Sequence, residues 1–213
     1  MYLHDRATAE SWLEWAGKKN PGRWVDHSYN VAKAAEVIAT AMQQSGEDID
    51  PNIAYICGIL HDIGRFRGVT PSVVHSYDGY QLMIEKGYPG NAQVCVTHSF
   101  PIQNRMIETS NGWDEVPNHV QKELISLIHQ FDWNQYDFLL TLCDALSEAD
   151  GFTLIERRLV SVAIRHGTNA NVPMHWKGFF QIKNDIEQKI GQSIYRFFPE
   201  TSDSIYSPIV IDN

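Results

Sequence analysis

Apolar residues recur every three or four positions along most of the chain, which is the spacing of one buried face of an α-helix. Over residues 25–44, the apolar side chains with this spacing are Val31, Ala34, Ala35, Ile38 and Met42. The same spacing predicts further helices over 7–17, 75–86, 90–98, 117–130, 134–149, 153–166 and 174–190. Strand-like alternation is scarce, and residues 207–211 form the single short candidate. We therefore predict an all-α fold, a helical bundle with irregular loops near 65–74 and 99–116.

Short polar residues and glycines predict where helices begin and end. Asp50 is expected to cap a helix that starts at Pro51, because its carboxylate can accept hydrogen bonds from first-turn N–H groups. Glycine readily adopts the left-handed conformation that closes many helices. The glycines expected to end helices are Gly17, Gly64, Gly87 and Gly151.

Length and composition are those of an ordinary globular protein. The 213 residues suit one domain, and 43% apolar with 20% charged residues excludes a disordered chain. No window approaches the roughly 18 uninterrupted apolar residues of a membrane-spanning helix. The first residues lack the basic start and apolar block of a signal peptide, so we expect a cytoplasmic location. Cys57, Cys95 and Cys143 lie in apolar stretches and are expected to be buried, reduced thiols.

The formal net charge of −9 limits the classes of partner. Nonspecific binding to a nucleic-acid polymer or to an anionic membrane calls for basic surface, so we expect neither partner. A small phosphorylated substrate remains compatible with this charge, because bound divalent cations offset negative charge where a phosphate docks.

The pair His61-Asp62 stands out because of its setting. The seven residues before it, 54–60, are apolar apart from the tyrosine hydroxyl. An imidazole and a carboxylate at the end of so apolar a helix are costly unless they are paired or bound to metal. The alternative is a structural role in capping the helix end.

His61-Asp62-Ile63-Gly64 resembles the signature of the HD-domain phosphohydrolases. That family's pattern begins with a histidine on an earlier helix, which His27 within 24–32 matches, and ends with an aspartate on a later apolar helix, which Asp144 within 139–147 matches. The resemblance implies a single HD-type helical domain over 1–213. Its motif-bearing core would span about 24–149, followed by a C-terminal helical extension over 150–213.

The same resemblance implies a metal centre. Its core ligands would be His27, His61, Asp62 and Asp144. Members with two metals carry two further histidines in between, and His75 and His98 occur in that order. Asp62 would then bridge two ions, with His27, His61 and Asp144 on one and His75 and His98 on the other. Imidazole and carboxylate ligands suit the divalent transition metals Fe, Mn, Zn, Co or Ni better than Ca.

The implied activity is hydrolysis of a phosphate ester or anhydride through metal-activated hydroxide. The expected substrate is a small molecule of the nucleotide class. Asp62 and Arg65 are the candidate catalytic residues. Arg65 would bind a phosphate oxygen, whereas its structural alternative is a cation favoured at a helix C-terminus. Lys33 and Arg67 are weaker candidates for the same role. The motif assigns no general acid and says nothing about oligomeric state.

Two other functions stay open at this stage. Some proteins similar to this pattern hold a di-iron centre and act as oxygenases, and others are non-catalytic nucleotide-binding regulators. Among hydrolases, the pattern resembles bacterial enzymes that split diadenosine tetraphosphate, although the residues after His98 differ from that branch. The HD-GYP branch is disfavoured because Gly87-Tyr88-Pro89 precedes His98 instead of following it.

The remaining notable side chains have mainly structural interpretations. Surface or helix-end positions are expected for His4, His119, His129, His166 and His175, with an approach to the site open only to His129. Trp113, in a polar loop, is the tryptophan to consider as a substrate contact. Glu148, one helical turn after Asp144, would lie on an exposed face or support that ligand.

Overall fold

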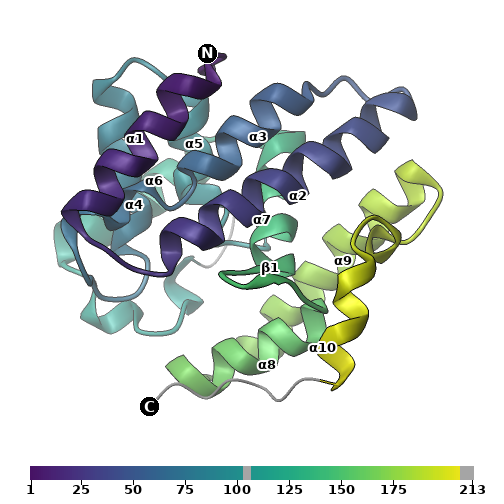
Figure 1. The fold of residues 1–213 in the computed structure, drawn as a ribbon. Coiled ribbons are helices and arrows are strands. Elements are labelled where there is room, and N and C mark those ends of the chain that lie inside the picture. The colour runs from purple at the N-terminus through teal and green to yellow at the C-terminus, as the bar shows by residue number, and fades with distance from the viewer. Residues whose placement is uncertain (103–106, 207–213) are drawn as a thin grey trace.

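A computed structural model describes residues 1–102 and 107–206, which form a bundle of α-helices with one small hairpin (Figure 1). The main helices are α1 (Arg6–Lys19), α2 (Trp24–Gln44), α3 (Pro51–Leu60), α4 (Val74–Glu85), α5 (Pro89–Thr97), α6 (Asn118–Gln130), α7 (Gln135–Leu146), α8 (Ile155–His166) and α9 (Val172–Ile190). The prediction of an all-α bundle is confirmed. The candidate strand at 207–211 lies outside the described residues.

Short elements occupy the connections. The 3₁₀ segments are η1 (Ile63–Arg67), η2 (Ile107–Thr109), η3 (Trp113–Glu115), η4 (Ile194–Phe197) and η5 (Pro199–Ser202), and the last helix is α10 (Asp203–Tyr206). Strands β1 (Ser147–Glu148) and β2 (Gly151–Phe152) pair antiparallel, with Ser147 opposite Phe152. The predicted irregular loop near 65–74 overlaps η1, and the described part of the loop near 99–116 contains η2 and η3.

Helices α2 and α3 lie side by side at the centre of the bundle, and α7 packs against both (Figure 1). The apolar face predicted on α2 is buried, and Val31, Ala35 and Ile38 on this face have no exposed surface. Small residues allow the close approach of α2 and α3, because a Cβ added at Gly58 would lie 2.4 Å from the Cα of Ala32. This central layer carries the apolar core that supports the site.

Two of the predicted helix ends are confirmed. The Asp50 carboxylate accepts a hydrogen bond from the backbone N–H of Asn52 at 2.8 Å, and Pro51 begins α3. Gly87 follows the last residues of α4 with a φ of 85°, the left-handed conformation that glycine favours. Cys57, Cys95 and Cys143 are buried and form no disulfide, as expected.

Three other glycines do not end helices where predicted. Gly17 lies inside α1, which continues to Lys19. Helix α7 stops at Leu146, so Gly151 lies in β2 of the hairpin. Gly64 lies in η1 and not at the end of α3.

Gly64 serves close packing instead. A Cβ at this position would lie 2.0 Å from the backbone oxygen of His75 and 2.4 Å from the backbone nitrogen of Gly79. Both neighbouring atoms belong to the backbone of α4, so no rotation of a side chain could relieve the contact. The absence of a side chain at residue 64 is therefore what allows η1 to lie directly on α4.

The C-terminal part of the chain packs back on the core. Ile155 and Leu159 of α8 and Ile182 and Ile186 of α9 are buried in the same apolar cluster as α2 and α7. Within the residues that the structure describes, no helix is both long and apolar enough to cross a membrane.

Candidate metal centre

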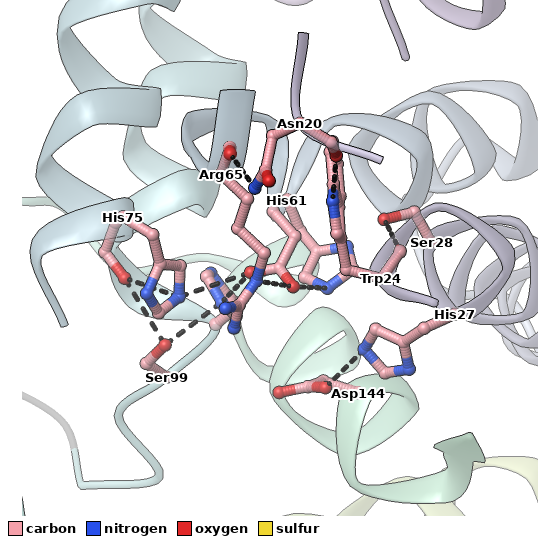
Figure 2. Close-up of polar contacts among 12 residues, drawn as sticks. Asn20, Trp24, His27, Ser28, His61, Arg65, His75, Ser99 and Asp144 are labelled. Carbon is pink, nitrogen blue, oxygen red and sulfur yellow. Dashed lines mark hydrogen bonds and ion pairs between the residues drawn. The ribbon is translucent and has the colours of Figure 1, made fainter. Parts of the chain in front are cut away.

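The six predicted metal ligands come together at one place, although they arise from five separate segments. Figure 2 labels four of them, His27, His61, His75 and Asp144. His27 lies in the first turn of α2, and His75 in that of α4. His61 and His98 directly follow α3 and α5, and Asp144 lies in the last turn of α7. The ligands therefore lie at or next to helix ends. Because His61 and Asp62 follow the last residue of α3, both adjacent side chains can reach the same centre.

Asp62 occupies the middle of the group. Its Oδ1 lies 3.2 Å from Nε2 of His75 and 3.6 Å from Nε2 of His98. Its Oδ2 lies 3.8 Å from Nε2 of His61, while Nε2 of His27 lies 2.9 Å from Oδ1 of Asp144. The ligand atoms form two triads, His27–His61–Asp62 and Asp62–His75–His98, each within 4.8 Å. Asp62 belongs to both triads, as a bridging carboxylate must.

Three of the histidine rings are oriented by backbone oxygens three or four residues earlier in the chain. Nδ1 of His61 lies 2.7 Å from the backbone oxygen of Gly58. Nδ1 of His75 and Nδ1 of His98 each lie 3.2 Å from a backbone oxygen, of Ser72 and Val94 respectively. An N–H at Nδ1 leaves Nε2 with a lone pair directed at the centre, which is the arrangement of a metal-binding histidine.

The buried polar atoms fit a cation. Among the described residues, Nε2 of His61 and Oδ1 of Asp62 are buried at the centre without a hydrogen-bond partner. Leaving such atoms unpaired costs about 1–3 kcal/mol each. Two acceptors also cannot satisfy one another, as with Oδ1 of Asp62 and Nε2 of His75, so a cation between them resolves the conflict. The donor set of imidazoles and carboxylates suits a divalent transition metal.

The acid–base properties agree with this interpretation. Burial lowers the pKa of His61 to about 3, and burial together with the charge of Arg65 lowers the pKa of His75. Burial opposes ionisation of Asp62, but the nearby Arg65 and His61 hold the pKa of this carboxyl well below its usual range. Neutral imidazoles and an ionised carboxylate are the protonation states that metal binding requires.

The direction of the pKa shifts of His98 and Asp144 is set by their charged or hydrogen-bonded neighbours. Burial lowers the pKa of His98, but the interaction with the nearby Asp62 carboxylate outweighs burial and raises the pKa overall. The pKa of Asp144 is lowered, because the hydrogen bond and charge of His27 outweigh the effect of burial. The Ser99 hydroxyl, which sequence reasoning missed, lies 3.0 Å from Nε2 of His98.

Arg65 lies beside the centre (Figure 2). Its Nε donates to Oδ2 of Asp62 at 2.5 Å, and its backbone oxygen accepts a hydrogen bond from the side chain of Asn20 at 2.7 Å. The residue belongs to η1, beyond the end of α3, so it does not cap that helix. The weaker candidates lie elsewhere: Lys33 is exposed on α2, and Arg67 pairs with Asp78 at 2.9 Å.

A cavity of about 460 Å³ is lined by five of the six candidate ligands, all except the buried His61. The remaining lining residues are Arg23, Trp24, Arg65, Ser99, Glu148, Ala149, Arg158, Ser161, Val162, Arg165 and His166. Sequence reasoning missed three of these arginines, Arg23, Arg158 and Arg165. For the last two the available signal was the helical spacing of residues 158, 161, 162 and 165 on α8.

The other side chains considered from the sequence are also placed. His166 is the exposed last residue of α8, as expected, but it also lines the cavity. Glu148 lies in β1 and not on a helix, with its Oε1 3.9 Å from the Arg158 guanidinium. Trp113 packs in the apolar cluster beneath α6, and His129 is exposed near the end of that helix. Neither lines the cavity.

Comparison with known proteins assigns the family. The family model named HD domain matches residues 24–148. A 64-residue segment is 33% identical to "Uncharacterized protein MJ0778" of Methanocaldococcus jannaschii, covering 30% of this chain and 37% of that protein. No solved structure matches the chain. The match over more than half of the chain shows that it belongs to the HD domain family, a superfamily of the metal-dependent hydrolase type.

Proposed function

We propose that this protein is a metal-dependent phosphohydrolase that cleaves a phosphate ester or anhydride of a small molecule, with nucleotides as the first class to test. The observation that carries the proposal is the pair of overlapping ligand triads sharing Asp62 at the base of an arginine-lined cavity. Hydrolysis of a phosphate needs positive charge around the phosphoryl oxygens, and guanidinium groups are well suited to bind them.

The six candidate ligands form two sets, one for each of two divalent transition-metal ions. His27, His61 and Asp144 would hold one ion, and His75 and His98 the other, with Asp62 contacting both. When bound, such ions supply an activated water and neutralise phosphate charge. The chain prepares this by keeping Asp62 and Asp144 ionised in a largely buried site.

Arg65 positions the substrate. Its Nε–H is engaged by Asp62, so the terminal N–H groups of the guanidinium remain the ones to bind a phosphate oxygen. The contact with Asp62 also fixes the guanidinium beside the ligands, which lowers the entropy lost when the phosphate binds. Trp24 forms another part of the wall, and its indole N–H donates to the backbone oxygen of Asn20 at 2.9 Å.

The alternatives fit the same site less well. A di-iron oxygenase would use the same ligand set, but four arginines around the cavity favour an anionic substrate. A non-catalytic regulator would have no need of all six ligands, and the six lie together here.

The test is metal analysis of the purified full chain followed by a phosphate-release screen over nucleotides and simple phosphate esters. We expect release of inorganic phosphate that a chelator abolishes and that Mn²⁺, Fe²⁺, Co²⁺, Ni²⁺ or Zn²⁺ restores. The rate should be the same in air and under strict anaerobiosis. His129→Ala, an exposed histidine outside the cavity, is the matched control and should retain activity. No release by metal-loaded protein, or a rate that vanishes without O₂, would overturn the proposal.

A further inference from the structure

One wall of the cavity comes from α8, which lies beyond the segment matched by the family model. The α8 residues that line the cavity are Arg158, Ser161, Val162, Arg165 and His166. Their spacing of three, four, seven and eight residues puts them on one face of the helix. We call this set the α8 face.

Core packing determines where the α8 face points. Ile155 and Leu159, on an adjacent side of the helix, are 0% and 7% exposed and pack in the main apolar core. Val160 and Ile164, on the outer side, are 39% and 49% exposed. The orientation of α8 is therefore fixed by burial of its apolar side, and the basic face is held against the cavity without help from the charges themselves.

The charge of the cavity is unusual for this chain. Within the part of the chain that the structure describes, four arginines line it, in a protein with a net charge of −9. The carboxylates in the lining are Asp62, Asp144 and Glu148, and two of these are candidate metal ligands. With metal ions bound to those two, the cavity carries a large excess of positive charge, more than one phosphate group would neutralise.

Arg158 connects the α8 face to the candidate metal centre. Its guanidinium lies 4.0 Å from Oδ1 of Asp144 and 3.9 Å from Oε1 of Glu148, and its side chain is only 18% exposed. Both separations are longer than a hydrogen bond, so the N–H groups of this largely buried side chain can turn to a bound anion. An anion at this position would adjoin the His27–Asp144 side of the centre.

The pKa of His166 is affected by the same cluster of positive charges. Its pKa is lowered by partial burial and then by the positive charges of Arg165, Arg65 and Arg158. Guanidinium groups from η1 and from both ends of the α8 face therefore act on one region of the cavity. The cavity volume of about 460 Å³ lies within the roughly 300–1,000 Å³ of small-molecule sites.

We propose that Arg158, Arg165 and His166 form a second anion-binding site beside the metal centre, which takes a second phosphate group of the substrate. The substrate class is then a molecule with two linked phosphates, such as a nucleoside diphosphate or a longer phosphoanhydride. The catalytic part of this inference rests on the proposed function, whereas the binding part does not.

Binding measurements test the site without turnover. Methylenediphosphonate, which resists hydrolysis, and methylphosphonate, its one-anion counterpart, are titrated into the full chain by calorimetry. Wild-type protein should bind methylenediphosphonate about tenfold or more tightly than methylphosphonate, since a charged hydrogen-bond pair typically contributes at least this factor. Arg158→Ala and Arg165→Ala should each reduce this preference by about tenfold.

Arg157→Ala is the matched control, because it removes the same charge from the same helix at a residue that does not line the cavity. It should leave the preference unchanged. If Arg157→Ala and Arg165→Ala lose the same amount of preference, the effect comes from net charge alone and the second site is refuted. A wild-type protein with no preference for methylenediphosphonate would also refute it. If the alanine variants unfold, Arg158→Gln and Arg165→Gln, which keep most of the side-chain stem, carry the same test.

Kinetics separate the two proposals. In metal-loaded enzyme, Arg165→Ala should raise the KM of a nucleoside diphosphate more than the KM of p-nitrophenyl phosphate. If no phosphate ester is hydrolysed, the proposed function is refuted. The calorimetric preference for methylenediphosphonate then still tests whether the second anion-binding site exists. If hydrolysis occurs and both KM values change equally, the second site fails alone.

Discussion

Replacing Gly64 by alanine should disturb one half of the metal centre through the backbone. The added Cβ would lie 2.0 Å from the backbone oxygen of His75 and 2.4 Å from the backbone nitrogen of Gly79. Real Cβ contacts essentially never fall below 3.0 Å, so η1 and α4 must separate by about 1 Å. The ligand atoms of Asp62 and His75, now 3.2 Å apart, lie on the two segments that would move.

The expected cost follows from overpacking. Forcing an extra methyl group into a closely packed contact costs about 1–3 kcal/mol, and more where only backbone can yield. For a chain of this length, each kcal/mol lowers Tm by about 2–4 °C. We also expect weaker binding of the ion held by His75 and His98, because about 1 Å is large compared with the tolerance of metal–ligand distances.

Thermal unfolding and elemental analysis measure the two effects. Gly17→Ala is the matched control, because Gly17 lies within a helix and its added Cβ would meet only the side chain of Val25, with Cγ2 at 2.9 Å. That control should keep its metal content and lose less in Tm than Gly64→Ala, because the contact is with the end of a side chain and because alanine favours the helix more than glycine does. Gly64→Ala protein with full metal content and an unchanged Tm would refute the reasoning.

The remaining predictions concern ligands, substrate and pH. Asp62→Ala should lose both ions and His98→Ala only one, as elemental analysis will show; a fully loaded wild type with one ion per chain would contradict this. Arg65→Ala should keep its metal and lose about 10²–10³ in kcat/KM, with partial recovery in Arg65→Lys; normal kcat/KM with a lower Tm would argue for a structural role instead. Burial raises the pKa of Asp137 against the hydrogen bond from Thr97, so the folded chain holds this proton more tightly than the unfolded chain. Stability should therefore fall as pH rises from about 4 through the raised pKa, and denaturation of Asp137→Asn should show a flatter dependence; equal slopes would count against the assignment.

The sequence predicted the helices well because their signal is local. The stripe on α2 and the cap at Asp50 depend on residues close together in the chain. The cost of an unpaired histidine and aspartate at the end of an apolar helix pointed only to His61 and Asp62. The other four candidate ligands were predicted from the resemblance to the HD-domain family. Gly64 and Gly151 were misplaced because a glycine can serve a left-handed turn, a hairpin or a close contact, and the sequence does not distinguish them.

The α8 face could not be predicted in the same way. The helical spacing of Arg158 and Arg165 places them on one side of α8, but arginines on one side of a helix usually face solvent, so this spacing alone does not predict a cavity wall. Their role depends on how Ile155 and Leu159 dock in a core built mainly by earlier helices. That docking is a property of the tertiary fold.

The hydrogen bonds at Nδ1 have a consequence for how the protein acquires its metal. His61, His75 and His98 each contact a backbone oxygen three or four residues earlier in the chain, so the preceding backbone orients each ring. The ligand directions are then set once the helices have packed, before any ion arrives. In zinc fingers, by contrast, the metal drives folding of the chain. Here the chain would fold first and load afterwards, so different metals could exchange in the centre without unfolding, and the ion present would reflect which metal the cell makes available.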